Sequence, residues 1–213
     1  WRLTKEDRFR EVVGETLEYV RRELTHPDGA FYAAQDADSE GHEGAYFVWG
    51  PGEIVSVLGA NAAEEFCRHY GVTESGNFEG MNVLNRLGGT QIAPDALQAL
   101  RSARVKLLAA RERRIKPERD DNILTSWNAM MVSAYLDAYQ AFGVPAYLAA
   151  AERALTFLLD YAVENGRVYR AVTAGKGRVN GYLDDAGCLA AALLDAFEAT
   201  SHRWYLDQAR EVT

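Results

Sequence analysis

The amino-acid sequence predicts a mainly all-α fold, part of an α/α toroid of helical hairpins with a small β-hairpin extension. Three observations favour this class. Helical periodicity runs through most of the chain, a hairpin-length segment occurs twice in its second half, and the two helices of a hairpin differ in their apolar patterns. One hairpin cannot bury its own apolar face, so several must pack side by side. Residues 1–213 are therefore expected to form one domain.

The first helix is predicted over residues 5–24, where apolar residues recur at helical spacing on one stripe and charged residues lie opposite. A turn at Pro27–Gly29 follows it. The strings AFYAA and AYFVW are typical of two short strands around a polar loop, so residues 26–50 are predicted to be a β-hairpin insertion.

Residues 51–114 predict three further helices and a loop. Pro51 stands where a helix start tolerates proline, and GEIVSVLG follows it. AAEEFCRHYG is expected to form a second helix that ends at Gly71, and a long third helix should run from Pro94 to about Arg114. Residues 72–93 are rich in glycine and are expected to be a loop.

The rest of the chain predicts two helical hairpins, with helices near 123–142 and 145–164, then 183–200 and 203 onward. A glycine-rich, strand-like segment, NGRVYRAVTAGKGRVNGYL, separates the hairpins. Asp120, Asp121 and Asn122 are good N-cap residues for the helix that begins near 123. The sequence thus predicts helix capping at this point.

The two hairpins form an internal repeat. Superposing Ala134–Ala154 on Ala192–Val212 aligns Leu136 with Leu194 and Asp137 with Asp195. A weaker copy near the N-terminus places TLEYV of the first helix on ALTFL of the helix at 145–164. The repeating unit is therefore predicted to be a helical hairpin with a short β extension after its second helix.

The two helices of a hairpin are expected to have different surroundings. The helix at 123–142 is apolar on nearly all sides, whereas the helix at 145–164 has one apolar stripe. A helix that is apolar on most faces is buried between other helices. The pattern indicates inner and outer helices that alternate around a toroid.

Composition excludes several classes of function. The formal net charge is −8 and the pI is about 5.1, which disfavours binding to nucleic acid or to an anionic membrane surface. No apolar run approaches the roughly 20 residues that span a bilayer. The two cysteines, Cys67 and Cys188, have neither CxxC nor zinc spacing, so a cytoplasmic location is expected.

Three motifs, GAFYAAQDADSEGHEGAYFVW, YGVTESGNFEGMNVL and RDDNILTSWNAMM, resemble a family of spermatogenesis-associated or thioredoxin-domain-containing proteins. The resemblance covers nearly the whole chain. It implies an N-terminal thioredoxin-like domain followed by an (α/α)6 barrel that resembles six-hairpin glycosidases and N-acylglucosamine 2-epimerases.

This chain departs from the family pattern. It holds no thioredoxin-like domain and no CxxC, so redox chemistry is not carried over, and it has about half the helices of a full barrel. We therefore expect an incomplete barrel, and the missing thioredoxin-like domain is an expected partner. Ala129 replaces the glycine expected after SWN, and GYLDDAG is a variant of the usual run, which weakens the expected inner-helix contacts.

The string QDADSEGHEG is one candidate site. Asp36, Asp38 and Glu40 mimic the opening of an EF-hand loop, but position twelve is Phe47 instead of a bidentate glutamate, so that interpretation fails. A looser metal site or a site for sugar hydroxyls is one hypothesis, with Asp36 and Asp38 as catalytic carboxylates and Gln35 as a ligand-binding residue. A solvated hairpin loop is the other.

The string KPERDDNILTSWNAMM is a second candidate. Capping explains one or two of its acids but leaves Arg119 and the buried Asn128 unexplained. In a toroid the first turns of inner helices line the cavity, where Trp127 could stack on a sugar ring and Asn128 could bond its hydroxyls. Arg119 and Asp120 are therefore predicted to bind ligand as well, and Asp121 to be catalytic; a purely structural role is the alternative.

The repeat aligns position 185 with position 127, so two acid-rich helix starts should lie side by side at one rim. Paired carboxylates are what glycoside chemistry uses, which favours Asp185 as catalytic and Asp184 as ligand-binding. Paired capping acids are the alternative. Glu79, in the loop string GNFEG, is a further ligand-binding candidate, against an ordinary loop.

Two functions follow. The first is a carbohydrate-active barrel, either a glycoside hydrolase or a sugar epimerase, acting on a small sugar-like ligand. The second is a non-catalytic binding or scaffold module for the thioredoxin-like domain. Neither a phosphate-binding glycine loop nor a cofactor fingerprint occurs in the sequence, so neither cofactor nor metal is expected.

Overall fold

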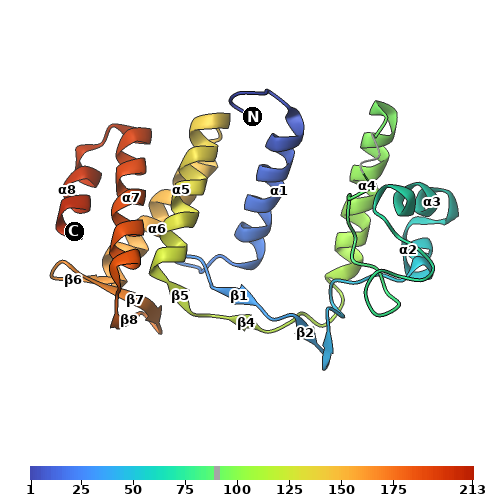
Figure 1. Ribbon diagram of the computed structural model, residues 1–213, viewed down its shortest axis with the longest axis horizontal. Coiled ribbons are helices and arrows are strands. Elements are labelled where there is room, and N and C mark those ends of the chain that lie inside the picture. The colour runs from blue at the N-terminus through green and yellow to red at the C-terminus, as the bar shows by residue number, and fades with distance from the viewer. Residues whose placement is uncertain (89–91) are drawn as a thin grey trace. The chain divides into compact units, whose positions relative to one another are not determined.

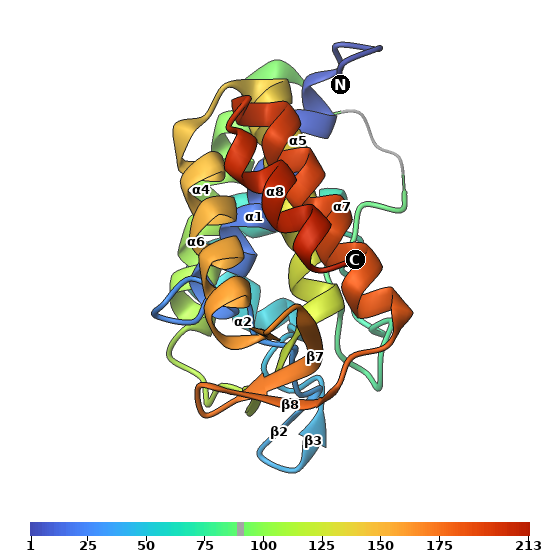
Figure 2. The ribbon, with the colours of Figure 1, turned by 90° about the vertical axis from the view of Figure 1, so that its left-hand side faces the viewer.

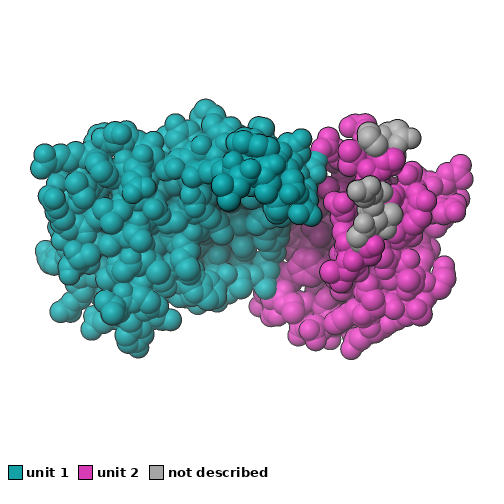
Figure 3. Space-filling model, turned by 45° about the horizontal axis from the view of Figure 1, so that its top comes forward, with its two compact units in different colours: residues 1–35, 119–213 teal, residues 36–118 magenta. Residues whose placement is uncertain are grey.

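The computed structural model describes residues 1–88 and 92–213. Residues 89–91, part of the predicted loop at 72–93, lie outside the described residues. The chain divides into two compact units, coloured separately in Figure 3. Unit 1 comprises residues 1–35 and 119–213, and unit 2 comprises residues 36–118. The sequence predicted one domain over residues 1–213, and each unit is described in turn.

Unit 1 contains five helices and most of the strands described. Its helices are α1 (Asp7–Glu23), α5 (Thr125–Phe142), α6 (Pro145–Tyr161), α7 (Leu183–Thr200) and α8 (Arg203–Glu211). Its strands are β1 (Ala34–Gln35), β4 (Arg119–Asp120), β5 (Ile123–Leu124), β6 (Val163–Glu164), β7 (Arg167–Thr173) and β8 (Lys176–Asn180). The prediction of a mainly all-α fold is confirmed.

The predicted repeat is present in unit 1. The helices α5 and α7 both span 18 residues, and their first residues, Thr125 and Leu183, are a pair that the repeat alignment superposes. The outer helices α6 and α8 follow them, and α5 packs against both α6 and α7. Figures 1 and 2 show β7 and β8 at the end of unit 1 where α5 and α7 begin.

The weaker repeat is also present. Helix α1 has the same length as α6, 17 residues, and its first residue, Asp7, is the one that the alignment places on Pro145 at the start of α6. A bridge between Thr25 and Phe31 follows α1, and the β6–β7 pair follows α6. The predicted repeat, a helical hairpin with a β extension after its second helix, is therefore seen in the structure.

Burial along α5 explains its apolar character. Its side chains pack against α6, α7 and α1, so Ala129 and Val132 are fully buried. Leu136 is 1% exposed, whereas its repeat mate Leu194 on α7 is 42% exposed. The difference arises because helices flank α5 on both sides, while part of the surface of α7 is exposed to solvent.

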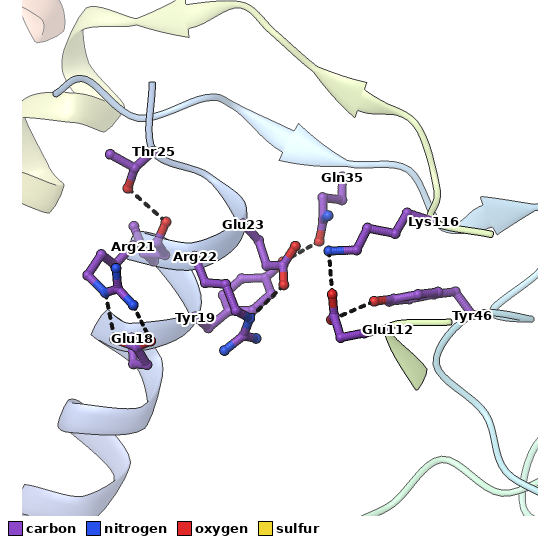
Figure 4. Close-up of polar contacts among 11 residues, drawn as sticks. Glu18, Tyr19, Arg21, Arg22, Glu23, Thr25, Gln35, Tyr46, Glu112 and Lys116 are labelled. Atoms are coloured by element: carbon purple, nitrogen blue, oxygen red, sulfur yellow. Dashed lines mark hydrogen bonds and ion pairs between the residues drawn. The ribbon is translucent and has the colours of Figure 1, made fainter. Parts of the chain in front are cut away.

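The last turns of α1 are held by ion pairs that Figure 4 shows. Arg21 donates from Nε and Nη2 to the two carboxylate oxygens of Glu18, at 2.7 and 2.6 Å. Glu23 is buried, and Arg22 Nε donates to it at 2.7 Å. A buried carboxylate needs such a partner, so this pair accounts for a charge inside the fold.

Unit 2 has the helices α2 (Pro51–Leu58), α3 (Ala60–His69) and α4 (Pro94–Arg111), and the strands β2 (Asp38–Ser39) and β3 (His42–Glu43). Arg114 organises the segment before α2. Its Nη1 donates to three backbone carbonyls, at Ala45, Tyr46 and Val48, and its Nη2 donates to Glu53 at 2.6 Å. One guanidinium thereby satisfies several backbone acceptors.

The predicted hairpin over residues 26–50 is corrected by the structure. Only its tip pairs, as Asp38 with Glu43 and Ser39 with His42. The flanking string AFYAA pairs elsewhere, through β1 with β4, and Trp49 bridges to Asn82. The predicted strand AYFVW is mostly a turn, because the N–H groups of Phe47 and Val48 both donate to the carbonyl of Gly44. The partners of Ala34 and Trp49 are distant in sequence, and no short-range pattern indicates them.

Strands β1 and β4 form a two-stranded stem at the point where the chain leaves and re-enters unit 1. Ala34 pairs with Asp120, and Gln35 pairs with Arg119. The next residues, at the two ends of unit 2, are also bonded, because Asp36 N–H donates to the Glu118 carbonyl at 2.7 Å. Unit 2 is thus an insertion between α1 and α5. None of the helices in the part of the chain that the structure describes combines the length and apolar character needed to cross a bilayer.

Candidate functional site

Strand β7 holds the starts of both inner helices. Thr125, the first residue of α5, donates its hydroxyl to the carbonyl of Tyr169 at 2.6 Å. Gly181, just before α7, donates its N–H to the carbonyl of Val168 at 2.9 Å. Because both contacts are made to neighbouring residues of one strand, the two helix starts lie at the same edge of unit 1, as the repeat predicted.

Arg170, the next residue of β7, contacts both acids at the start of α7. Its Nη1 lies 3.8 Å from Asp184 Oδ2 and 3.4 Å from Asp185 Oδ2. The guanidinium also lies over the ring of Tyr182, 5.1 Å from its centroid. Arg170 and Tyr182 did not stand out in the sequence, because only the β7 fold brings this arginine to the helix start.

Asp185 is the most buried acid of the predicted set, with no solvent exposure. Its Oδ2 accepts a hydrogen bond from the backbone N–H of Tyr182 at 3.0 Å, so it caps the start of α7. Its Oδ1 has no hydrogen-bond partner among the described residues. A buried acceptor without a partner is uncommon in folded proteins, so this oxygen is a candidate for contact with a ligand or a water molecule.

Trp127 lies in the first turn of α5 and is 53% exposed. Tyr182, at the start of α7, is 62% exposed, and Asp184 beside it is also exposed. We call Trp127, Arg170, Tyr182 and Asp184 the helix-start surface. It presents two aromatic rings and an arginine–carboxylate pair on neighbouring elements.

Asn128 points into the protein, where its amide is used within the fold. Its Oδ1 accepts from the Phe31 N–H at 2.7 Å, and its Nδ2 donates to the carbonyls of Phe31 and Leu124, both at 2.9 Å. The side chain is only 2% exposed. The sequence argument that this amide must find a partner is correct, but the partner is the backbone that follows α1.

Asp120, Asp121 and Asn122 do not cap α5, so the prediction that they are its N-cap residues is wrong. Leu124 occupies the N-cap position, and Arg119–Asp120 form β4 instead. The Asp120 carboxylate accepts from the N–H of Asn122 at 3.0 Å, a local turn that competes with capping. The cap residues lie too early because β5 is inserted between them and the helix.

Arg119 is paired rather than free. Its Nε donates to Asp121 Oδ1 at 2.6 Å, and this hydrogen bond raises the pKa of the guanidinium above its ordinary value. The same guanidinium lies 3.8 Å from the ring centroid of Tyr32. Asp121 therefore has a structural partner, and it also lines a pocket together with Tyr32.

The remaining predicted residues lie around the stem and in unit 2. Gln35 accepts at Oε1 from the Tyr19 hydroxyl at 2.8 Å. Asp36 accepts at Oδ1 from the N–H of Asp38 at 3.1 Å, an ordinary turn contact, and Asp38 is exposed on β2. Glu79 is exposed on a turn with a positive φ of 47°.

The loop around Glu79 is organised by a residue that the sequence did not single out. Asn82 is fully buried; its Oδ1 accepts from the Thr73 N–H, and its Nδ2 donates to the carbonyls of Thr73 and Trp49. No signal short of the fold distinguishes it from the neighbouring asparagines. Among the described residues, no group of three or more His, Cys, Asp or Glu side chains is placed to hold a metal ion.

Neither cysteine shows the features of a reactive thiol. Cys67 and Cys188 are both free and partly buried. Burial raises the pKa of the Cys67 thiol, which disfavours the thiolate. Because the thiolate is the reactive form, this environment suits a packing role.

Comparison with known proteins supports the resemblance seen in the sequence. Human spermatogenesis-associated protein 20 is 31% identical over 98% of this chain, and the mouse protein of that name is 29% identical. An uncharacterized Caenorhabditis elegans protein is 28% identical over 98% of the chain. The chain spans 32% of the length of the two mammalian proteins and 34% of the nematode protein. No family model matches the chain.

Two solved structures are similar in general arrangement. D-mannose isomerase is 17% identical, with a TM-score of 0.40 over 100% of this chain and 51% of its own. Cellobiose 2-epimerase from Bacillus thermoamylovorans is 12% identical, with a TM-score of 0.41 over 97% of this chain and 55% of its own. These are loose likenesses, and they carry no argument about the reaction.

Proposed function

We propose that this chain, a relative of the spermatogenesis-associated proteins, binds a small sugar-like ligand at the helix-start surface of unit 1. The observation that carries the proposal is that two exposed aromatic residues, Trp127 and Tyr182, stand at the neighbouring starts of α5 and α7, where Arg170 contacts Tyr182 and Asp184. The rings of Trp and Tyr combine a large apolar face with a polar group, the indole N–H or the phenolic hydroxyl.

The chemistry of the surface suits a polyhydroxylated ring. The apolar face of a sugar can stack on Trp127, while its hydroxyls can donate to Asp184 and accept from Arg170. The side chains of Arg170 and Asp184 are 38% and 59% exposed, so both keep groups available to a ligand. Their ion pair orders both side chains before a ligand arrives, which reduces the entropy cost of binding.

Binding is favoured over catalysis because the predicted catalytic acids of unit 1 have internal partners. Asp121 is paired with Arg119, and Asp185 caps α7 and contacts Arg170. A glycosidase requires two carboxylates that flank the scissile bond. A binding module requires only the stacking ring and the polar cluster. In the parent protein, we propose that this module presents its ligand to a thioredoxin-like domain, and a pull-down with that domain should recover the chain.

The test is titration of the chain with D-mannose and with cellobiose, a one-ring and a two-ring probe, followed by NMR. Trp127→Ala should weaken binding at least tenfold and leave the melting temperature nearly unchanged, because the side chain is half exposed. Trp204→Ala, at a ring 44% exposed on α8, is the matched control. Equal affinity of the Trp127→Ala variant and the native chain for both sugars would refute the proposal, as would the absence of binding at tens of millimolar.

One observation favours a second candidate, a glycoside hydrolase or sugar epimerase. The Oδ1 of Asp185, without a partner among the described residues, is a buried acceptor that a reacting hydroxyl or a catalytic water could satisfy. Hydrolysis of aryl glycosides and epimerisation of free sugars, both followed by NMR, test this candidate. Turnover by the native chain that is lost in Asp185→Asn, with sugar binding retained, would support it; no turnover by the native chain would exclude it.

A further inference from the structure

We infer that unit 1 carries a second binding site, an aromatic pocket for a small organic ammonium cation. The pocket has a volume of about 340 Å³ and is lined by six side chains that bear on its chemistry: His26, Asp28, Tyr32, Asp121, Phe157 and Tyr161. It lies where α1 and α6 end, next to the turn between β7 and β8. None of these residues belongs to the helix-start surface.

The walls of the pocket form a continuous aromatic cluster. The ring of His26 lies 5.5 Å from that of Tyr32 and 5.3 Å from that of Phe157, and Phe157 lies 4.7 Å from Tyr161. Nδ1 of His26 accepts from the Asp28 N–H at 3.0 Å, which fixes the orientation of the imidazole. Several π faces and edges therefore surround one small volume, the arrangement that recognises ammonium groups.

The charges around the pocket also favour a cation. Asp28 and Asp121 contribute carboxylates to the lining, and the described residues that line it include no lysine or arginine. Helix α6 ends at Tyr161 with no basic residue in its last turn and with Asp160 as its penultimate residue. The unpaired carbonyls of a helix C-terminus carry partial negative charge, which attracts cations.

One ring of the cluster already binds a cation within the fold. The Arg119 guanidinium lies 3.8 Å from the Tyr32 ring centroid, and Asp121 neutralises it at 2.6 Å. Asp28, by contrast, is 66% exposed, and the atom 3.7 Å from its carboxylate, Nδ1 of His26, accepts a backbone hydrogen bond and so does not pair with it. The carboxylate of Asp28 is thus the one available to pair with a ligand, and Tyr161, 39% exposed, offers its ring.

The volume sets the size of the ligand. A cavity of about 340 Å³ is near the lower end of the range for small-molecule sites, which suits a compact head group rather than a long chain. A trimethylammonium group fits this description, because it presents apolar methyl groups to the rings and a positive charge to Asp28.

The test uses the full chain and choline as the probe, with NMR titration at low salt. The control ligand is 3,3-dimethyl-1-butanol, which has the shape of choline without its charge. Choline should bind and the alcohol should not reach the same affinity. Because a cation–π contact contributes about 0.5 to 2 kcal/mol, Tyr161→Leu should weaken choline binding about 2- to 30-fold, whereas Tyr161→Phe should preserve it.

The charge is tested by Asp28→Asn, which should weaken choline binding about 2- to 5-fold, the scale of an exposed ion pair. Asp137→Asn, at an acid on α5 whose side chain is 79% exposed, is the control and should have no effect. Melting temperatures of all variants show that they are folded. Equal binding of choline and the alcohol, equal binding by the Leu and Phe variants, or no binding of choline at all would each overturn the inference.

Discussion

Asn128 offers the sharpest test of the fold, because the sequence and the structure give its amide different roles. The structure joins it to Phe31 and Leu124 by three hydrogen bonds of 2.7 to 2.9 Å, inside the protein. Asn128→Ala removes all three bonds at once. A ligand-binding role would predict weaker binding with little effect on stability.

The magnitude follows from these contacts. Each bond contributes about 1 kcal/mol net, and every buried backbone group left without a partner costs about 1 to 3 kcal/mol. The variant leaves the N–H and the carbonyl of Phe31 unpaired, and Phe31 is itself only 5% exposed. We therefore expect the free energy of unfolding to fall by about 3 to 5 kcal/mol. In a chain of this size that is a drop of about 6 to 20 °C in melting temperature.

Chemical denaturation followed by circular dichroism measures this loss, with the slope checked for constancy. Gln140→Ala is the control on the same helix, because Gln140 is exposed and accepts a single bond from Arg2. It should change the stability by less than about 0.5 kcal/mol. If Asn128→Ala lowers the free energy of unfolding by less than about 1 kcal/mol, as the control does, the three hydrogen bonds of Asn128 are not a source of stability.

Three further outcomes are expected. Gly29→Ala should destabilise the fold by more than about 2 kcal/mol, because φ is +112° and the new Cβ would lie 2.6 Å from the Cβ of an α6 arginine; Gly41→Ala, at φ +77° with open space, should cost about 1 kcal/mol. Burial raises the pKa of Tyr135 to about 12, above the ordinary value of about 10. The stability that this shift contributes is therefore complete below pH 10 and is lost as the pH rises to about 12. Tyr135→Phe should flatten this part of a plot of stability against pH. Leu136→Ala should cost about 2 to 5 kcal/mol, and Leu194→Ala, at the equivalent but exposed position, less than about 1 kcal/mol in denaturant titrations; equal losses would contradict the burial difference.

The helices were predictable because each carries its own signal. Periodicity and proline placed α2 and α4, and periodicity gave the bounds of α7 and placed the start of α5 within two residues of Thr125. The pairing of β1 with β4 was not predictable, since it joins residues that are separated by the whole of unit 2.

The candidate site was only partly predictable for the same reason. The neighbouring helix starts followed from the repeat, but the partners of their acids did not. Asp184 and Asp185 contact Arg170 because β7 lies beside the start of α7. Asp121 contacts Arg119 because both residues lie near a strand pair instead of at a helix cap. The aromatic pocket draws on the loop after α1, on α6 and on the turn between β7 and β8, so no single stretch of sequence displays it.

The stem that joins the two units has a consequence for the order of folding. Closing a loop of roughly 80 residues costs about 4 kcal/mol in chain entropy, which opposes formation of the β1–β4 pair. Unit 2 presents its two ends already bonded, from Asp36 N–H to the Glu118 carbonyl. Once folded, unit 2 holds β1 and β4 close together, as a tight turn holds the two strands of a hairpin. The entropy cost of closing the loop is therefore offset before α1 packs against α5. On the ribosome, residues 36–118 emerge before α5, so unit 2 can fold first and serve as the nucleus around which the sequence-distant halves of unit 1 assemble.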